Sequence, residues 1–424
     1  MPEQSPLLAG AAVVDITPPA GLMMSGYAAR TQPATGSHDA LTARAIAVGD
    51  TAIVVADVIG LHEDSCARIR SRCRLPGDRV VVIATHTHGG PVSMAARGGA
   101  GWDAGFLARL EDGCVEALDR AVAAQRPAVL SAGTGANPGV AFNRRHDGGV
   151  IDPAVPMLRI DGVDGRAIAV LAAHACHPVV LAAYNRQYTA DFPNYVREAL
   201  QAAVPGAVAV FMTGCAGDIS TGHSPHSSIS TVPTADRTFA EAERLGQRIA
   251  ASALAATLHR LDGGISAAAE AIELDFERNE TAPLPVLAAE WRGKAAESDP
   301  AWATLYDCWA DWAGTIALQP LTPWTGKVTV LDWAGARLSF MPGEMFAQSA
   351  LNVRGDAMRV HFVNGFADGV PGYIPPEAEY PFGGYEVLEA HRYYGLPAAF
   401  AAGSAERLEA AAIRLNAQLD RLRS

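Results

Sequence analysis

Two histidines, His86 and His88, are separated by a single residue in the segment Thr85-His-Thr-His-Gly-Gly-Pro91, directly after an apolar run. If a strand continues through them, side chains two positions apart point to the same side and reach one pocket. Neutral imidazole suits zinc, and a hydrolytic zinc site combines about three protein ligands with water. The glycines that follow let a ligand approach the backbone closely. The pair therefore indicates a metal site, although hydrogen-bonded structural histidines give the same pattern.

Other groups that could ligate a metal also follow apolar runs. His174 and His177 frame the segment His-Ala-Cys-His-Pro, in which we favour His177 as a third imidazole and His174 as a buried core histidine. Glu344 ends the segment Met-Pro-Gly-Glu. A glutamate is usually a solvated surface residue, but its position at a strand end favours a ligand or a general base.

Several polar residues could assist catalysis. Asp218 and Ser220 follow a glycine-rich turn, which is more typical of a turn or cap than of a nucleophile, because no GxSxG segment surrounds Ser220. Arg144 could clamp a carboxylate or polarise a carbonyl, or form a surface ion pair. Tyr373 and Tyr385 lie in glycine-containing loops, where a tyrosine usually packs but can also donate a hydrogen bond to an oxyanion.

The elements that must position these residues are short apolar strands. Expected strands include 51–57, 79–84, 167–172, 207–213, 336–340 and 358–363. Five of these runs end in polar clusters: THTHGG, HACHP, TGCAGDIS, MPGE and NGFAD. Because ligands bind at the carboxyl ends of strands in α/β sheets, we expect the five endings to share one site.

Amphipathic helices are expected between the strands. The segments 105–125 and 240–261 place apolar residues on one face, and a last helix starts near Ser404. Alternation of strands and helices along the chain predicts an α/β architecture. We expect residues 1–424 to form a single domain, with a helical, tryptophan-rich insertion around residues 279–319.

The composition excludes several classes of partner. A formal net charge of -12 repels phosphate backbones, and no Lys/Arg run reverses it locally, so we expect no nucleic-acid partner. No apolar run reaches the roughly 20 residues that span a bilayer, which predicts no membrane insertion. The acidic start predicts no signal peptide, and scattered cysteines predict free thiols, so we expect a cytoplasmic protein that could form a homo-oligomer.

Taken together and in this order, the motifs resemble the neutral/alkaline non-lysosomal ceramidase family. The likeness begins at Val14-Asp-Ile-Thr-Pro18 and Met24-Ser-Gly-Tyr27, and continues through THTHGGP, Asn143-Arg144, the His177-Pro178 segment, GDIS and PGE. It ends at Gly372-Tyr373 and Gly384-Tyr385-Glu386, and so covers most of the chain. The resemblance implies a catalytic domain of layered, mixed β-sheets flanked by helices.

The resemblance also implies the roles of the site residues. Zinc (Zn²⁺) would be held by His86, His177, Glu344 and Tyr373. The catalytic site would be lined by His88, Arg144, Ser220 and Tyr385, with Asp218 beside them. On this basis His88 would move a proton to the leaving amine, while Arg144 and Tyr385 would stabilise an oxyanion or hold a substrate carboxylate. Ser220 would orient the water or the substrate.

Departures from the family direct the substrate prediction. Thr221-Gly222 follows Ser220 where the ceramidases have Pro-Asn, and the segment Tyr188 to Pro193 also differs. We therefore predict a zinc-dependent amidohydrolase that cleaves a carbon–nitrogen bond of a small-molecule amide or lactam, with a ceramidase-like lipid amide hydrolase as the alternative.

Two further alternatives come from other classes of protein. A TIM-barrel amidohydrolase also uses an HxH pair, but neither Lys294 nor Lys327 follows a strand as a bridging lysine would. A non-catalytic metal-binding protein on the same scaffold would lack an open metal position and the Arg144/Tyr385 pair.

Overall fold

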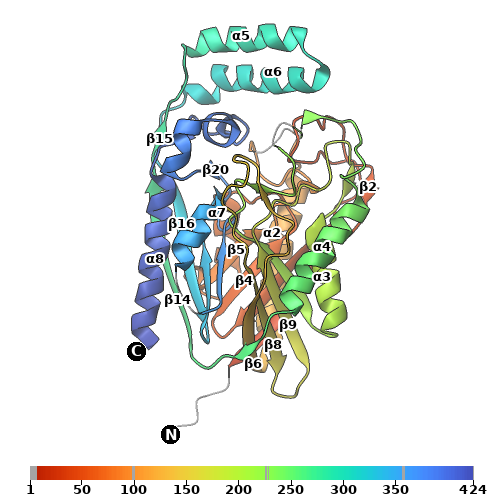
Figure 1. The fold of residues 1–424 in the computed structure, drawn as a ribbon, viewed down its shortest axis with the longest axis vertical. Helices are drawn as coiled ribbons and strands as arrows, with labels where there is room; N and C mark the ends of the chain where they lie inside the picture. Colours follow the sequence, from red (N-terminus) through yellow and green to blue (C-terminus); the bar gives the residue numbers. More distant parts are fainter. Residues whose placement is uncertain (1–6, 98–100, 225–226, 228, 356–358, 424) are drawn as a thin grey trace.

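The computed structural model describes residues 7–97, 101–224, 227, 229–355 and 359–423. Its centre is a pair of β-sheets packed face to face, with helices on the outer faces (Figure 1). This arrangement is the predicted layered α/β fold. Strands of both directions occur in both sheets, so the structure excludes the TIM-barrel alternative, which needs a closed ring of parallel strands.

Nine strands of the described chain form the larger sheet. In spatial order they are β11 (Val208–Thr213), β9 (Ala167–His174), β8 (Val155–Gly162), β6 (Arg126–Gly135), β1 (Leu8–Asp15), β3 (Thr42–Val48), β4 (Thr51–Ala56) and β5 (Val80–Ala84), with β13 (His259–Arg260) paired to β6. The pairs β4/β5 and β9/β11 are parallel, whereas β1/β3, β3/β4, β6/β8 and β8/β9 are antiparallel.

The smaller sheet has four strands within the described residues. Their order is β14 (Ile265–Leu274), β16 (Trp324–Trp333), β17 (Ala336–Phe340) and β19 (His361–Asn364). The predicted strand 358–363 corresponds to β19, and its first residue, Met358, lies outside the described residues. Side chains such as Ile53, Leu171, Trp333 and Phe362 form the buried core between the two sheets. This core makes both sheets rigid supports for the loops at their ends.

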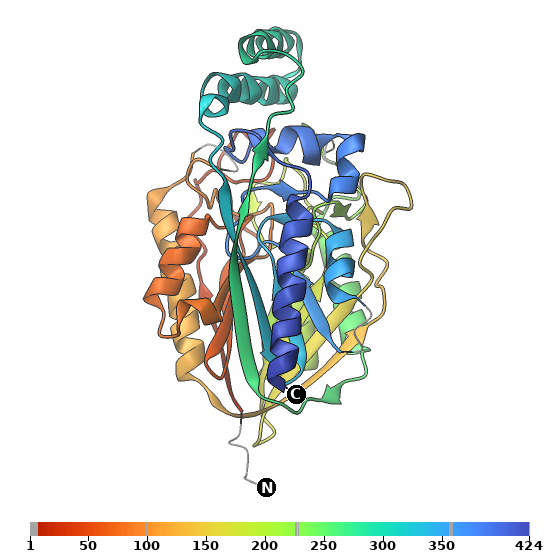
Figure 2. The ribbon, with the colours of Figure 1, turned by 90° about the vertical axis from the view of Figure 1, so that its left-hand side faces the viewer.

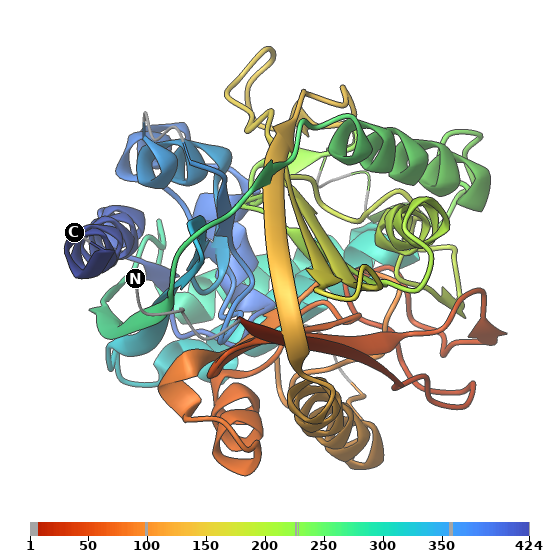
Figure 3. The ribbon, with the colours of Figure 1, turned by 90° about the horizontal axis from the view of Figure 1, so that it is seen from below.

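Helices cover the outer faces of the sheets. Figure 2 and Figure 3 show one group against each half of the larger sheet and another beside the smaller sheet. These helices are α1 (Glu63–Arg72) and α2 (Ala104–Ala123), then α3 (Phe192–Ala203) and α4 (Phe239–Leu254), then α7 (Ala347–Arg354) and α8 (Ser404–Arg423). Helix α4 ends earlier than predicted, because the chain after Leu254 turns back to pair β13 with β6. No helix in the described part of the chain has both the length and the apolar character needed to cross a membrane.

A tryptophan-rich helical hairpin stands over one end of the molecule. It consists of α5 (Leu284–Glu297) and α6 (Pro300–Gly314), and Figures 1 and 2 both show it beyond the ends of the two sheets. Its own small core includes Trp291, Trp309 and Trp312. The hairpin occupies the segment predicted as a helical insertion, while the single-domain organisation stays a prediction.

Short strand pairs connect the loops at this end of the sheets. They are β2 (Gly36–Ser37) with β10 (Gln187–Tyr188), β7 (Phe142–Asn143) with β12 (Ile219–Ser220), β15 (Phe276–Glu277) with β21 (Ala399–Phe400), and β18 (Glu344–Met345) with β20 (Tyr373–Ile374). The pairing of β18 with β20 places Glu344 directly opposite Tyr373. Two residues separated by 29 positions in the chain are thereby fixed next to each other.

Candidate metal centre and active site

The five polar strand endings meet at one place. The Thr213 hydroxyl donates to the Thr85 carbonyl at 2.6 Å, which joins the ends of β11 and β5. Gly217 donates to the Met345 carbonyl at 2.8 Å, and Gly214 forms a bridge to Asn364. The convergence expected from the sequence is therefore present, and it joins the end of the larger sheet to the end of the smaller one.

His86 reaches the site through an unusual backbone conformation. Strand β5 ends at Ala84, so the His86-x-His88 pair lies in a loop and not on a continued strand. His86 has a φ of 63°, in the left-handed region that residues other than glycine rarely adopt. The Phe366 ring stacks on the imidazole, with ring centroids 4.2 Å apart and planes 28° apart. Backbone strain at a buried histidine is typical of a functional site.

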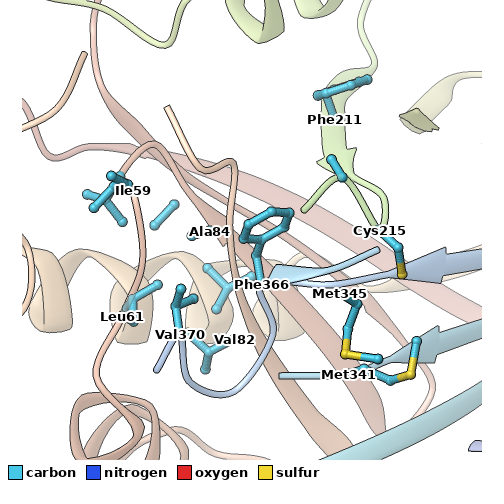
Figure 4. Close-up of a cluster of buried hydrophobic side chains, with 14 of the residues drawn as sticks. Ile59, Leu61, Val82, Ala84, Phe211, Cys215, Met341, Met345, Phe366 and Val370 are labelled. Atoms are coloured by element: carbon cyan, nitrogen blue, oxygen red, sulfur yellow. The ribbon is translucent and has the colours of Figure 1, made fainter. Parts of the chain in front are cut away.

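Phe366 belongs to a hydrophobic cluster that packs against the His86 side of the site. Figure 4 shows Phe366 among Ala84, Met345 and Cys215, with Val370 nearby. The cluster thus brings together side chains from the endings of β5, β11, β17 and β19. The last ending, NGFAD, therefore contributes the Phe366 ring that packs on His86. Its Asp368 forms an ion pair with Arg70 at 2.5 Å, away from the histidines.

Three imidazoles are oriented in the same way. The Nδ1 of His86 contacts the Ile59 carbonyl at 2.6 Å, that of His88 contacts the Gly26 carbonyl at 3.0 Å, and that of His177 contacts the Ala216 carbonyl at 2.6 Å. A carbonyl can only accept, so each Nδ1 carries the proton and each Nε2 keeps a lone pair. Metal-ligating histidines are typically fixed by such contacts.

The Nε2 atoms and the Glu344 carboxylate face one another. The ligand atoms of His86, His88 and His177 lie within 4.8 Å of one another, and His86 and His177 Nε2 lie 3.2 Å and 3.0 Å from Glu344 Oε2. Among the described residues, His86 Nε2 and His88 Nε2 have no hydrogen-bond partner. Imidazole lone pairs that face a carboxylate are repelled by it unless a cation or an added proton lies between them. The donor set therefore fits a bound metal ion.

Burial controls the protonation of these groups. Burial, aided by the Arg144 charge, lowers the pKa of His177 to about 4, and burial with the neighbouring histidines lowers the pKa of His88 well below its usual value. Burial alone would raise the pKa of Glu344, but positive charge on the side where His86 and His177 lie holds that pKa well below the ordinary range. Neutral imidazoles beside an ionised carboxylate are the forms that bind a divalent metal.

Tyr394 is a site residue that the sequence analysis did not identify. Its hydroxyl donates to Glu344 Oε1, which leaves Oε2 to face His86 and His177. The residue lies 50 positions after Glu344, in the segment Tyr393-Tyr-Gly, and no spacing rule for metal sites relates the two positions. The one sequence signal for Tyr394 is that it lies beside a glycine, as Tyr373 and Tyr385 do.

Arg144 is held in a network at the wall of the site. Its Nη2 donates to the Tyr373 hydroxyl and to the Gly217 carbonyl, each at 2.9 Å, and its Nε donates to Glu386 Oε1 at 2.9 Å. Burial raises the pKa of Tyr373 well above its usual value, although the Arg144 charge opposes this, so the phenol is neutral. The Tyr373 ring stacks on His177, with centroids 6.4 Å apart. Tyr373 is thus next to the histidine group, with its oxygen on Arg144.

Tyr385 lies beside Tyr373 and lines the same cavity as His88 and Arg144. Burial raises the pKa of its hydroxyl, which therefore stays protonated and able to donate a hydrogen bond. The cavity has a volume of about 380 Å³. A site with a metal-type donor set, a guanidinium and a neutral phenol around one cavity has the components of a hydrolytic centre.

Neither Ser220 nor Asp218 lines the cavity, although His223, the partner of Ser220, does. The Ser220 hydroxyl donates to the His223 carbonyl at 2.7 Å. The Asp218 carboxylate accepts from the Ala347 N–H, at the start of α7, at 2.8 Å, and from Asn143 Nδ2 at 2.9 Å. Burial raises the pKa of Asp218 to about 6. These contacts connect the GDIS loop to the segment that carries Glu344, and the roles predicted for the two residues stay predictions.

Two glycines permit the close packing of these loops. A Cβ at Gly26, whose φ is +99°, would lie 2.5 Å from the His88 ring, and a Cβ at Gly217 would lie 2.5 Å from the Glu344 carbonyl oxygen. Any side chain at either position would displace a histidine or the glutamate of the site.

The layered sheets, the converging strand ends and the buried histidine–carboxylate group define an α/β protein with a site that could hold a metal ion. The family model for neutral/alkaline non-lysosomal ceramidase, N-terminal, matches residues 7–254, more than half of the chain. The chain belongs to this family of hydrolases, as the sequence motifs indicated.

Solved structures share the whole fold. The neutral ceramidase from Pseudomonas aeruginosa superposes with a TM-score of 0.74 at 19% sequence identity, over 98% of this chain and 75% of that one. A ceramidase complexed with C2 superposes with a TM-score of 0.75 at 18% identity, over 99% of this chain and 76% of that one. At these identities the likeness establishes the fold, and the chemistry must be argued from the residues of this chain.

Proposed function

We propose that the protein is a zinc-dependent amidohydrolase that cleaves a carbon–nitrogen bond of a small amide or lactam. The observation that carries the proposal is the group of imidazole Nε2 atoms that face Glu344 Oε2 at 3.0–3.2 Å beside a cavity of about 380 Å³. His86, His177 and Glu344 would hold the ion, with Tyr373, which pairs with Glu344, as a fourth ligand. When bound, zinc supplies Lewis acidity and lowers the pKa of a coordinated water towards ~7.

The residues around the cavity have distinct proposed roles. His88 lines the cavity with a free Nε2, which can hold the proton released by the attacking water and pass it to the leaving amine. Tyr385, whose hydroxyl stays protonated, and Arg144 would donate hydrogen bonds to the developing oxyanion or to a substrate carboxylate. Asp218 would position the loop beside Glu344, and Ser220 would fix the same loop through His223.

A panel of amides, lactams, peptides and esters tests the reaction, and metal analysis tests the ion. We expect about one zinc per chain in the purified protein, loss of amide hydrolysis after removal of zinc by a chelator, and recovery when zinc is added back. Full hydrolysis by the metal-free protein would contradict the proposal, as would hydrolysis of esters without any amide or lactam.

A lipid amide is the second candidate substrate, because the family includes ceramidases. The volume of the cavity opposes it. A cavity of about 380 Å³ lies at the lower end of the ~300–1,000 Å³ range of small-molecule pockets, which favours a compact substrate over a two-chain lipid. Competition between ceramide and a short amide for the same enzyme would decide between the two.

We further propose a cytoplasmic location. The six cysteines are free in the structure, which suits a reducing compartment. Fractionation of the native host, with detection of the full chain by antibody, tests this point, and light scattering of the purified protein tests whether it forms a homo-oligomer.

A further inference from the structure

The cavity is enclosed from two sides by different parts of the chain. His88, Arg144, Tyr373 and Tyr385 line the side of the candidate metal centre. The other wall includes Trp302, Leu305, Cys308 and Trp309, all from α6 of the tryptophan-rich hairpin. The hairpin that stands over the ends of the sheets in Figures 1 and 2 is thus part of the substrate pocket.

This wall is fixed to the body of the protein. Trp309 Nε1 donates to the Tyr393 hydroxyl at 3.1 Å, and Trp312 Nε1 donates to the Leu396 carbonyl at 2.8 Å. Tyr393 itself lines the cavity, beside Tyr394, which holds Glu344. A wall anchored through two indole hydrogen bonds keeps a defined distance from the metal centre, as a size-selective pocket requires.

A second, more open hollow adjoins the cavity. This outer groove has a volume of about 700 Å³ and is lined by residues 29–32, 183–184, 186 and 229–232 together with the start of α6. Trp302, Thr304, Arg30, Thr31 and Ile229 line both the groove and the cavity. Trp302 is the largest of these shared side chains, and its ring packs on Tyr306 with centroids 5.9 Å apart. Trp302 therefore stands between the two spaces.

We propose that α6 sets the size of the substrate, and that Trp302 is the residue that closes the inner cavity against the outer groove. This inference rests on the proposed amidohydrolase function and narrows it to a substrate class. The substrate is a compact amide whose acyl part is apolar, because the cavity of about 380 Å³ lies at the lower end of the range for small-molecule pockets and has aromatic walls. On this proposal a longer acyl chain would meet the Trp302 ring at the boundary between the cavity and the groove.

The test measures binding and turnover separately. Straight-chain carboxylic acids from hexanoate to hexadecanoate are titrated into the protein by calorimetry, and the anilides of the same acids are assayed for hydrolysis. Affinity should rise with each added methylene while the chain stays inside the cavity, and then fall about tenfold or more between decanoate and hexadecanoate. Trp302→Ala should abolish this fall and favour the longest acids, and Trp302→Phe should give an intermediate profile.

Val286→Ala is the control on the same hairpin, because it shortens an exposed apolar side chain of α5 that lines neither the cavity nor the groove. It should keep the length profile of the unmodified protein. Three results would overturn the inference: no binding of any acid, affinity that increases steadily to hexadecanoate, or a Trp302→Ala protein with the original profile. A clear length limit in binding without hydrolysis of any anilide would instead refute the amidohydrolase function and leave the size limit standing.

Discussion

At the scale of single residues, the site depends on which nitrogen of each histidine faces the cavity. Backbone carbonyls accept hydrogen bonds from the Nδ1–H groups of His86, His88 and His177. The three Nε2 lone pairs are therefore all available to bind a metal ion. These carbonyls belong to loops that no sequence motif connects to the histidines. The spacing His-x-His indicated a metal site, and the sequence analysis favoured His177 over His174 as the third imidazole. The structure places the His177 ring, and not the His174 ring, in the histidine group. His174 contacts the Ala154 carbonyl and lies outside the histidine group.

Substitution can test whether His86 binds the metal while His88 transfers the proton. We expect His86→Ala to lose both zinc and activity. His88→Gln should keep about one zinc per chain but lose hydrolysis by 10²–10⁴-fold, the usual contribution of a general acid–base group. Metal analysis and initial rates on the same preparations provide the measurement. His146→Gln, at a partly exposed position paired with Glu379, is the control. Loss of zinc from His88→Gln would make His88 a ligand.

Tyr394→Phe isolates the hydrogen bond that orients Glu344. The change removes the hydroxyl that donates to Oε1 and keeps the buried ring. We expect zinc affinity to fall by about 10–100-fold, the usual effect of losing a group that orients a metal ligand. Competition with a chromophoric chelator measures this affinity. Tyr393→Phe is the matched control, because its hydroxyl accepts from Trp309 and does not touch Glu344. Equal affinity in both variants would show that Tyr394 does not orient the ligand.

At the scale of elements, the hairpin of α5 and α6 is attached to the protein through aromatic contacts. The Arg392 guanidinium carbon lies 4.8 Å, 4.5 Å and 5.5 Å from the ring centres of Trp291, Trp309 and Trp312. A guanidinium among indole faces is attracted by the ring quadrupoles, and the attraction grows as water is excluded. Arg392 is therefore a link between the hairpin and the loop that carries Tyr393 and Tyr394.

Arg392→Ala should loosen this hairpin. We expect a loss of about 2 kcal/mol of local stability, the scale of a desolvated cation–π contact, and faster amide exchange within residues 284–314. Hydrogen-exchange mass spectrometry measures this directly. Arg292→Ala is the control on the same hairpin, because its exposed pairs with Asp307 and Asp311 contribute little. Unchanged exchange in the Arg392→Ala protein would mean that the indole hydrogen bonds alone hold the hairpin.

At the scale of the whole molecule, stability in acid depends on histidines buried in the neutral form. His361, on β19, contacts the Ser339 hydroxyl at 2.8 Å. Burial, together with neighbouring arginine charges, lowers its pKa to about 3. The unfolded chain binds the proton near pH 6.5 and the folded chain only near pH 3, so the stabilising effect is complete above pH 6.5 and is lost as the pH falls towards 3.

The slope of stability against pH tests this linkage. For His361 alone, the free energy of unfolding should fall by about 1.4 kcal/mol for each pH unit between about 6 and 3. Urea denaturation at several pH values measures it. His361→Gln should be less stable at pH 7.5 but show a shallower slope below pH 6. A parallel slope in the two proteins would assign the acid sensitivity to other groups.

The sequence by itself determined the layers and the strand ends of this protein. Apolar runs of strand length indicated which segments form buried strands, whereas their pairing came from the structure. The polar endings predicted a shared site because the carboxyl ends of parallel strands meet at one edge. The strands 51–57 and 336–340 correspond to β4 and β17 almost residue for residue.

Only the tertiary structure decided which role each strand ending has at the site. NGFAD supplies a ring under His86, GDIS anchors the segment of Glu344, and Tyr394 arrives from a loop without a recognisable pattern. The His86-x-His88 pair lies in a loop with a left-handed residue, and not on the strand that its spacing suggested. Trp302 and Trp309, two of the tryptophans of 279–319, line a cavity beside the histidines. The sequence could not show this, because contacts between distant segments depend on how the layers pack and are not encoded in local periodicity.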